Sequence, residues 1–595
     1  MGMGAANVEA RIAASVGELQ AVAPEFEAAM DVPFGGVLFA LPALIATGLL
    51  EATERFFKLP KGYYGLDTLF LLLAFMALTR LKSVEQLRYC APGEWGKLLG
   101  LDRVPEVRTL RKKIHLLSNT GQPEQWSAAL AQRWMRAAPE QAGVLYIDSH
   151  VRVYNGEQTK LPRHYVARQK LCLRATTDYW VNAMDGQPFF VVNQVVDPGL
   201  IRVIENDILP RLDRDVPGQP SAAALATDPL LHRFTVVFDR EGYSPEFLRR
   251  LKSQRVAGLT YHKFPSEDWP VEEFITRAVK LPTGEEVEMK LAERGTRLSN
   301  GLWLREIRKL TRRGHQTSVL ATDYRSDFVP LAAAMFARWS QENFFKYARE
   351  HYSLDRLADY QTEAISDPIQ VVNPAYRKLD GQVRSSTGKL HRVLAQFGAL
   401  TIEQSIEPEQ IEPVVRKKAL LQEEIELLQA EVQTLKDNRK ATLRHIDVKD
   451  LPEEERFRQL STHSKHFIDT IKIIAYRAET SMANVLRETM SHSDEARCLL
   501  RALYTTEVDL LPNYEQKTLI VRLHHLAQRA SDEVIRKLCD ELNATETLFP
   551  RTDLRLIFEL GTAHNLRDQV ICSCCSVQAA VGCAVTLRCS SCRDE

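Results

Sequence analysis

The chain has 595 residues, of which 45% are hydrophobic and 26% charged, and its 77 basic and 77 acidic side chains give a formal net charge of zero. These proportions are those of a soluble globular protein with three or four domains. A neutral chain has no general attraction to polyanions, so any nucleic-acid site must depend on local basic patches. No signal peptide is evident and most cysteines before residue 572 are isolated, so we expect a reducing, cytoplasmic location and not secretion.

Residues 1–80 contain two apolar segments, which we interpret as buried helices of a helical N-terminal domain. The first, residues 34–50, contains Pro42 and three glycines, and the second, residues 66–79, is shorter than a bilayer requires. We therefore predict no transmembrane segment and no role at a membrane.

Residues 81–135 are predicted to form short helices that end in a basic helix, in the manner of a helix-turn-helix-like DNA-binding module. Arg108, Arg111 and Lys112 in that helix are candidates for contacts with phosphates or bases. A solvated basic helix face explains the same spacing equally well, because spacing alone does not show that a groove is entered.

Three carboxylates mark residues 140–400 as the candidate catalytic core. Asp148 ends the apolar run that starts at Gly143, and Asp239 ends a second apolar run before a Gly turn, so both are expected at the ends of buried strands. Glu342 lies in a segment with helical spacing and is expected to reach the same cleft from a helix. Two Asp and one Glu that converge provide the oxygen ligands of two Mg²⁺ ions, with Mn²⁺ as a substitute.

Each of these acids alone has a simpler interpretation, because an Asp at a strand end commonly forms a turn or caps a helix. Asp178, Glu241 and Asp323 compete with the chosen three. Asp323 is the main alternative to Glu342, since it also follows an apolar run.

Basic residues accompany the acids. Lys160, Arg163, Arg168 and Lys170 form a basic strip beside the cleft, interleaved with Tyr165, that suits a DNA backbone. At about residues 267–315 a hairpin pattern and further arginines indicate a β-rich insertion, whose cations either hold DNA or lie on a solvated strand.

The core resembles the DDE transposases encoded by bacterial insertion sequences. In one large group of them the Glu helix carries Tyr, Arg, Glu and a final Lys or Arg at fixed spacing, and here Arg338, Glu342 and Arg349 fit while Met335 stands at the Tyr position. The segment Asp239-Arg-Glu-Gly-Tyr243 is similar to the Asp-Arg-Gly-Tyr pattern of that group with one Glu inserted. This resemblance, over residues 80–400, implies an RNase H-like mixed α/β core, metal-dependent DNA cleavage and strand transfer, and phosphate contacts by Arg338 and Arg349.

Residues 410–447 are predicted to form a coiled-coil helix. Apolar residues repeat at alternating steps of four and three from Leu421 to Leu435, through Ile425 and Val432. This seam either pairs two chains or folds back within one chain. Residues 454–565 are predicted as a largely helical α/β region that ends in a strand, a helix and a strand between Thr518 and Phe558, with no assigned chemistry.

The tail, residues 570–595, holds two C-x-x-C pairs at a spacing typical of zinc sites. It has no aromatic residue and no histidine, and its composition changes abruptly after Val570, so a frame-shifted terminus is favoured over a zinc site.

Together these features predict a nucleoid-associated bacterial transposase that binds double-stranded DNA at element ends and target, and that works as a homodimer when DNA-bound. A non-transposing RNase H-like nuclease and a catalytically inactive DNA-binding protein are the alternatives.

Overall fold

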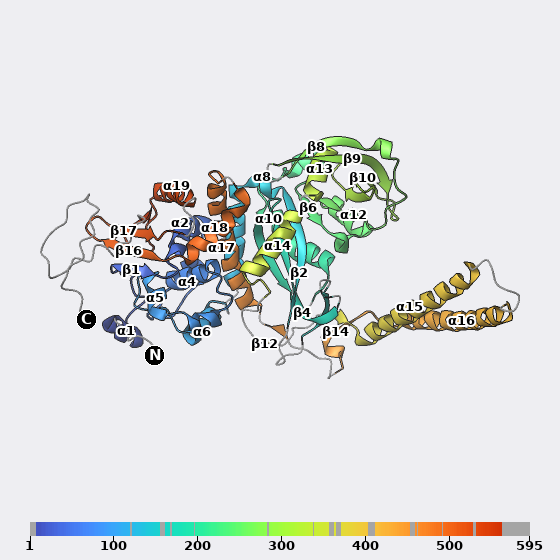
Figure 1. Cartoon of the computed structure of the whole chain (residues 1–595), viewed down its shortest axis with the longest axis horizontal. Coiled ribbons are helices and arrows are strands. Elements are labelled where there is room, and N and C mark those ends of the chain that lie inside the picture. The colour runs from blue at the N-terminus through green and yellow to red at the C-terminus, as the bar shows by residue number, and fades with distance from the viewer. Residues whose placement is uncertain are drawn as a thin grey trace, which may run out of the picture. The chain divides into compact units, whose positions relative to one another are not determined.

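The computed structural model is described for residues 7–118, 122–154, 161–166, 169, 171–194, 197–281, 285–336, 338–355, 362–363, 370–402, 411–452, 459–460, 462–490, 492–526 and 531–561 (Figure 1). The chain divides into two compact units. The first comprises Met1–Pro24 and Ala40–Ala483, and the second comprises Glu25–Phe39 and Asn484–Glu595.

A ten-stranded mixed sheet is the centre of the first unit, in the order β3-β4-β2-β6-β7-β11-β10-β9-β8, with β5 also paired to β4. The five strands that carry or flank the predicted acids are β2 (Val144–Val153), β4 (Leu171–Asn182), β5 (Pro188–Gln194), β6 (Thr235–Phe238) and β7 (Ala257–Tyr261). β2, β4 and β5 are antiparallel neighbours, whereas β6 lies parallel to both β2 and β7. All four residues of β6 are buried, as expected for a parallel strand covered on both faces.

The sheet continues beyond β7 as an antiparallel meander. Its strands are β11 (Gln316–Ala321), β10 (Trp303–Leu310), β9 (Glu286–Arg297) and β8 (Ile275–Lys280), and β3 (Arg163–Val166) pairs with β4 at the other end. Three of these strands, β8, β9 and β10, occupy the segment predicted as an insertion. The chain passes from this meander into α13 (Phe328–Phe336) and α14 (Trp339–His351).

Helices of residues 40–137 and 463–487 pack around a cluster of aromatic rings. Besides α13, α14 and the hairpin described below, the α-helices that lie wholly or mainly in the described part of the first unit are α1 (Val8–Ser15), α2 (Leu41–Thr47), α3 (Thr53–Phe56), α4 (Leu66–Leu78), α5 (Pro92–Lys97), α6 (Val107–Ser118), α7 (Gln122–Ala137), α8 (Pro139–Ala142), α9 (Leu200–Val203), α10 (Leu209–Asp215), α11 (Ala222–Thr227), α12 (Pro245–Ser253) and α17 (His463–Arg487). The rings of Phe57, Phe70, Trp126 and Phe467 lie with centroids 5.2 to 6.0 Å apart. This cluster binds α4, α7 and α17 together through mainly edge-on contacts.

The apolar helix α4 is an internal helix, because every residue from Thr68 to Leu78 is buried. In the part of the chain that the structure describes, no helix combines the length and the apolar character needed to cross a membrane.

The second unit is a four-stranded sheet with two helices. β1 (Ala29–Val32), β16 (Val508–Asn513), β17 (Thr518–Leu523) and β18 (Arg555–Leu560) lie in that order, and α18 (Ala496–Thr505) and α19 (Ser531–Ala544) belong to the same unit. β17 and β18 are parallel and α19 connects them, as the pattern between Thr518 and Phe558 predicts. The helical prediction for residues 1–80 misses β1, whose partner β16 lies nearly 480 residues away in sequence.

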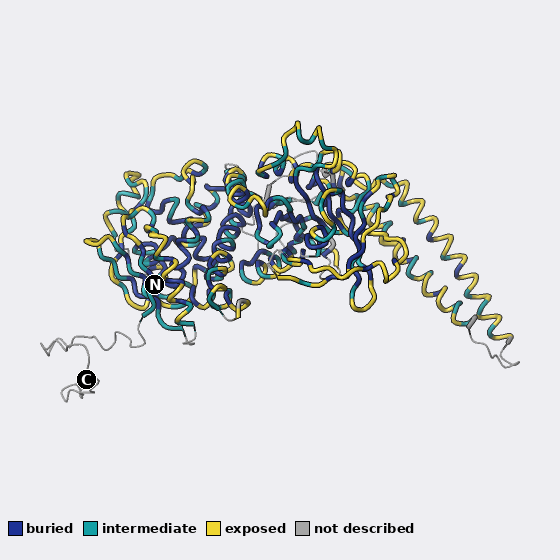
Figure 2. Tube along the Cα trace, turned by 90° about the horizontal axis from the view of Figure 1, so that it is seen from above, coloured by how far each residue is buried: buried dark blue, intermediate teal, exposed yellow. Residues whose placement is uncertain are grey.

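Two long helices form a hairpin within one chain. α15 (Pro374–Ile402) and α16 (Ile411–Ala441) lie side by side (Figures 1 and 2). At the base of the hairpin β13 (Gln370–Val372) pairs with β14 (His445–Asp447), and nearby β12 (Thr362–Glu363) pairs with β15 (Gln459–Leu460). The seam residues Ile425 and Val432 of α16 are each only 4% exposed, so the predicted apolar seam packs within one chain.

Candidate active site

Asp148, Asp239 and Glu342 line one cleft of about 1410 Å³ in the first unit. They come from three separate elements, β2, the turn after β6, and α14. The structure therefore brings the three predicted carboxylates to the same cleft.

Asp148 lies within β2 and not at its end as predicted. β2 continues to Val153 because residues after Asp148 still pair with β4. The parallel pairing with β6, however, stops at Tyr146. Asp148 is thus the second residue past the last one that pairs with β6, which leaves that side of β2 open to the cleft.

Asp239 directly follows β6 and begins a 3-10 turn over Arg240–Gly242. Its carboxylate accepts a hydrogen bond from the backbone N–H of Glu241 at 2.9 Å. Asp239 therefore fulfils the simple capping role and also faces the cleft. Glu241, which the sequence offered only as a competing acid, lines the same cleft.

Glu342 lies in the first turn of α14, and the predicted single Glu helix is divided. α13 ends at Phe336 and α14 begins at Trp339, with Arg338 at its N-cap position. Met335, at the position of the family tyrosine, belongs to α13 and is fully buried in the hydrophobic core. Because the break separates Met335 from Arg338, the Tyr position does not continue the helical face of Glu342.

Arg338 forms an ion pair with Asp148. Its Nη2 donates to Asp148 Oδ2 at 2.7 Å, and the two side chains are 9% and 18% exposed. The Nε atom of Arg338 is buried and has no hydrogen-bond partner among the described residues. The guanidinium accordingly supplies positive charge at Asp148 and retains one donor for another group.

The carboxylates of the cleft repel one another. Burial raises the pKa of Asp148, the charge of Arg338 lowers it, and the nearby charge of Asp239 raises it further. The pKa of Glu241 is raised to about 7, first by partial loss of hydration and then by the charges of Asp197, Asp239 and Asp148. Around Asp148, Asp239 and Glu241, the carboxylates thus carry more negative charge than Arg338 alone neutralises.

This set of side chains fits a hard divalent cation by its chemistry, since all its ligand atoms are carboxylate oxygens and their excess charge favours a cation. Among the described residues the three carboxylates do not form a group with all ligand atoms within 4.8 Å of one another. Asp148, Asp239, Glu342 and Glu241 are the side chains that could hold a cation here.

Cations also line the cleft. They come from β3, β4, the α9 segment, α14, α15 and the residue before β14, and they are Arg163, Arg174, Arg202, Lys346, Arg349, Arg377 and Arg444. Of the predicted basic strip, Arg163 lines the cleft, whereas Lys160, Arg168 and Lys170 lie outside the described residues. The sequence analysis missed Arg174, Arg202, Lys346, Arg377 and Arg444, because no local motif connects these five positions.

The predicted basic helix is α6, and its three candidate residues are not among those that line the cleft. Arg108, Arg111 and Lys112 are exposed, and Arg111 forms an ion pair with Glu85. An exposed basic face is what both interpretations of this helix require, the DNA-binding helix and the solvated helix face.

Asp323 does not line the cleft. It follows β11 and accepts hydrogen bonds from the backbone N–H groups of Arg325 at 2.8 Å and Ser326 at 3.1 Å. Burial raises the pKa of Asp323, but these hydrogen bonds outweigh it and lower the pKa. Asp323 is therefore a turn-forming residue in this structure.

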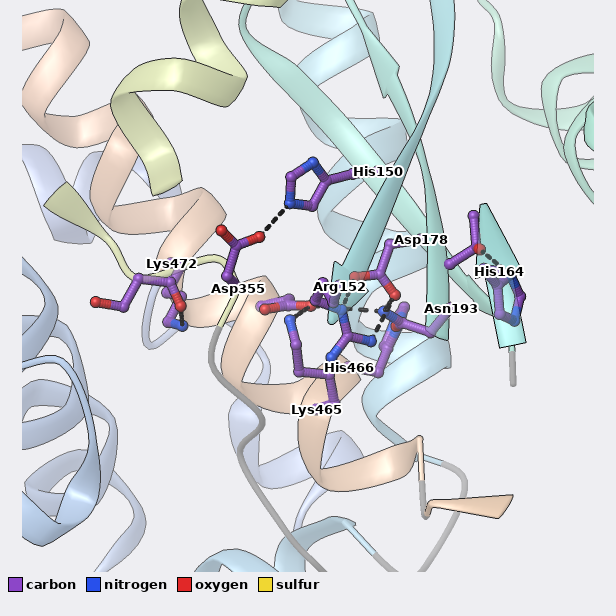
Figure 3. Close-up of polar contacts among 12 residues, drawn as sticks. His150, Arg152, His164, Asp178, Asn193, Asp355, Lys465, His466 and Lys472 are labelled. Carbon is purple, nitrogen blue, oxygen red and sulfur yellow. Dashed lines mark hydrogen bonds and ion pairs between the residues drawn. The ribbon is translucent and has the colours of Figure 1, made fainter. Parts of the chain in front are cut away.

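Asp178 belongs to a buried network of charges on the far part of β4 (Figure 3). It accepts hydrogen bonds from Arg152 Nη2 at 2.8 Å and from Asn193 Nδ2 at 2.7 Å. Lys465 and Asp469, from α17, form a second buried ion pair close by. The network joins β2, β4 and β5 to α17, so Asp178 has a structural role.

Two histidines line the cleft and lie beside acids. His150 Nε2 lies 2.6 Å from Asp355 Oδ1 (Figure 3), and its ring stacks on Phe345. His164 Nδ1 lies 3.6 Å from Asp197. These contacts fix both imidazole rings at the wall of the cleft.

In the second unit, Asp31, Asp509 and His524 place ligand atoms within 4.8 Å of one another. His524 Nε2 lies 2.9 Å from Asp509 Oδ1, and the backbone N–H of Asp31 donates to the same carboxylate oxygen at 3.2 Å. The imidazole and the backbone thus already satisfy Asp509. The cysteine-rich tail, residues 570–595, lies outside the described residues.

Comparison with known proteins gives one match over nearly the whole chain. A family model described as "Transposase protein" matches residues 2–562. Among solved structures, the chain is similar to a piggyBac transposase synaptic complex with hairpin DNA, with 9% sequence identity, coverage of 82% of this chain and 86% of that chain, and a TM-score of 0.23. No curated protein matches the chain.

Proposed function

Because the chain belongs to this transposase family, we propose that it is a DDE transposase of a bacterial insertion sequence, which cleaves the ends of its DNA element and joins them to target DNA. Asp148, Asp239 and Glu342 are the proposed catalytic acids. The observation that carries the proposal is that these three side chains, from three distant segments, line one cleft together with seven further cationic side chains.

The order of the strands supports an RNase H-like core. Three antiparallel strands, β5, β4 and β2, are followed by the parallel strands β6 and β7, and the first two acids lie on β2 and directly after β6. The antiparallel start of the sheet is the feature that the family resemblance leads us to expect.

Each group in the cleft has a role that follows from its charge. A pair of Mg²⁺ ions, held by the three acids, would supply charge neutralisation at the phosphorus and activation of water or a 3′-hydroxyl. Arg349 and Lys346, on the exposed part of α14, would bind phosphates that flank the scissile bond. Arg338 lowers the pKa of Asp148 and so favours its ionised form, and Glu241 is able to hold a proton in the cleft at neutral pH.

An excision assay tests the proposal. A plasmid that carries the DNA flanking the gene on both sides of a marker is incubated with the protein and MgCl₂, and cut and joined products are separated on a gel. We expect Asp148→Asn, Asp239→Asn and Glu342→Gln to lose at least about 1000-fold in cleavage rate. Each variant replaces a proposed metal-binding carboxylate by a neutral amide.

Asp323→Asn is the matched control, because the asparagine keeps the Oδ1 atom that accepts both turn hydrogen bonds. It should cleave and join at the wild-type rate. Loss of activity in this variant with activity retained in Glu342→Gln would reassign the third acid to Asp323. Cleavage without joining would identify a nuclease, and binding without cleavage would identify an inactive DNA-binding protein.

Transposition brings two element ends together, so we further propose a homodimer on DNA. The seam from Leu421 to Leu435 is buried within one chain at Ile425 and Val432. The dimer contact is accordingly expected elsewhere, and size-exclusion chromatography with and without end DNA measures it.

A further inference from the structure

The exposed face of α15 is strongly basic. α15 contains five Lys or Arg residues and one acidic residue, whereas α16 contains six basic and six acidic residues. Arg377, Lys378, Arg384, Lys389 and Arg392 are all exposed, and we name these five residues the α15 basic face. Within the hairpin, the positive charge is thus concentrated on one helix.

The opposite side of α15 packs on α16. Val383, Ser386 and Val393 are buried, and Ser386 Oγ donates to Glu431 Oε1 of α16 at 2.9 Å. Asp380, the one acid of α15, accepts from Arg439 of α16 at 2.7 Å and also pairs with Arg384 at 2.6 Å. Asp380 therefore offsets only Arg384 of the α15 basic face, and it is the one acid among the described residues of this helix.

Two glycines on the exposed side have no role in the packing of the chain. A Cβ atom added at Gly381 or at Gly388 would meet no atom within 4 Å. A glycine in a helix interior destabilises the helix relative to alanine, so a pair in open space reduces helix stability without any internal gain. Glycine at such a position is what a close approach of a ligand to the backbone requires.

The glycines and the arginines share one stripe, which starts in the catalytic cleft. Residues 377, 381, 384, 388 and 392 follow one another at steps of three or four, so they lie on one side of the helix. Arg377, the first of them, lines the cleft together with Arg202 and Arg444. Burial and the charges of Arg444 and Arg202 lower the pKa of the adjacent His445, which shows how closely the cations gather there.

From the stripe of cations, the two unpacked glycines and their continuity with the cleft, we propose that the α15 basic face binds the sugar–phosphate backbone of duplex DNA that leaves the catalytic cleft. Arg377, Arg384 and Arg392 contact phosphates, and the backbone approaches α15 at Gly381 and Gly388. A second copy of this face is a poor partner, because cations would then oppose cations. The inference rests on the proposed function, since the bound DNA is the substrate of the cleft.

The helix sets the length of DNA that is contacted. Arg377 and Arg392 are 15 residues apart, which corresponds to about 22 Å of helix. A duplex rises about 3.4 Å for each base pair, so the stripe follows about six or seven base pairs beyond the cleft.

The first test measures the salt dependence of DNA binding. A fluorescein-labelled duplex of about 40 base pairs and arbitrary sequence is titrated with the full chain at several KCl concentrations, and fluorescence anisotropy is recorded. The variant Arg377→Ala, Arg384→Ala, Arg392→Ala should flatten the plot of log K against log salt by about 2.7, because three phosphate contacts are lost.

The matched control removes the same charge from the same hairpin. Arg416→Ala, Lys417→Ala, Lys436→Ala changes exposed residues of α16 and should leave the slope within about 0.5 of wild type. Equal slopes in the two triple variants would overturn the proposal, because net charge alone would then account for the effect.

The second test uses the glycines. Gly381→Leu with Gly388→Leu keeps every cation and adds side chains whose Cβ atoms would meet no atom within 4 Å. We expect helix content at least as high as in wild type, and DNA affinity reduced about tenfold or more. Unchanged affinity would show that no ligand approaches the helix at these positions.

A photo-crosslinking residue at Ser385, which is exposed between the two glycines, identifies the occupant. The α15 basic face is assigned correctly if the product contains DNA. A protein–protein product, or none, would overturn the assignment. If wild type fails the excision assay while these DNA effects persist, the proposed function fails and the α15 surface stands as a DNA-binding site.

Discussion

Replacement of Asp178 by Asn should destabilise the protein strongly without any direct effect on the catalytic groups. Asp178 and Arg152 are 0% and 3% exposed as side chains, and Lys465 and Asp469 are 4% and 0% exposed. Two cations and two anions thus balance in this buried network. Figure 3 shows Arg152, Asp178 and Lys465 of this network. Asp178→Asn keeps the shape of the side chain and leaves one positive charge without a partner.

The expected cost is about 3–5 kcal/mol in the free energy of unfolding, the range for removal of one partner from a buried ion pair. A second estimate comes from the pKa of Asp178. Burial alone would raise the pKa of Asp178, but Arg152 and Lys465 outweigh it and lower the pKa to about 2. Relative to an ordinary Asp pKa of about 4, this amounts to about 2–3 kcal/mol.

The sign of the pH dependence follows from the lowered pKa. The stabilisation by ionised Asp178 is fully present above about pH 4 and is lost as the pH falls towards 2, because the unfolded chain then takes up the proton first. Wild type should therefore lose stability over this interval more steeply than Asp178→Asn does.

Urea unfolding followed by far-UV circular dichroism at pH 7 measures the effect. Asp228→Asn is the control, because Asp228 pairs with Arg325 on the surface, where both side chains are more than a third exposed and the pair contributes under about 1 kcal/mol. Adding Lys465→Met to Asp178→Asn restores the balance of charge and should recover part of the loss. A cost below about 1 kcal/mol for Asp178→Asn would refute the account of a charge-balanced network.

The remaining predictions concern the cleft and the hairpin. The raised pKa of Glu241, about 7, makes the folded chain lose stability as the pH rises from about 4.5 to 7. MgCl₂ should therefore raise the melting temperature more at pH 8 than at pH 6, and Glu241→Gln should reduce that difference. Equal shifts of the melting temperature at both pH values would contradict this prediction. Arg349→Ala should flatten the salt dependence of DNA binding by about 0.9, whereas Arg338→Ala should instead raise the pKa of Asp148 and move the pH–rate profile for cleavage to higher pH. Ile425→Asp with Val432→Asp should lower the helix content of a monomer, because these residues are buried within one chain; a change in oligomeric state at full helix content would assign the seam to a dimer.

The core strands and the acids could be predicted because their signals are local. β6 is a short apolar run in which every residue is buried, and Asp239 is the polar residue that stops it. The extension of β2 past Asp148 could not be predicted in the same way. His150 and Arg152 are polar, and the structure buries them only because Asp355, Asp178 and α17 supply partners from distant parts of the sequence.

The basic helix of the hairpin was missed although part of its signal is local. Its apolar residues repeat at alternating steps of four and three through Leu379, Val383, Leu390, Val393, Phe397 and Leu400, with Ser386 in one of the positions. Gly381 and Gly388 weaken the helix propensity of the same segment. Its buried residues Val383 and Val393 face α16, and that contact stabilises it. The short strand β1 also depends on a distant partner, since β16 is the strand that it pairs with.

The ladder between Gln370–Val372 and His445–Asp447 makes the hairpin a module with closely spaced ends. The chain leaves the core at β13 and returns at β14, one strand spacing of about 4.8 Å away, after more than seventy residues. A tight turn could connect the same two strands, because Val372 and His445 are already paired. The length of this arm can therefore change by insertion or deletion in evolution, or by design, while the acidic cleft keeps the same supporting sheet.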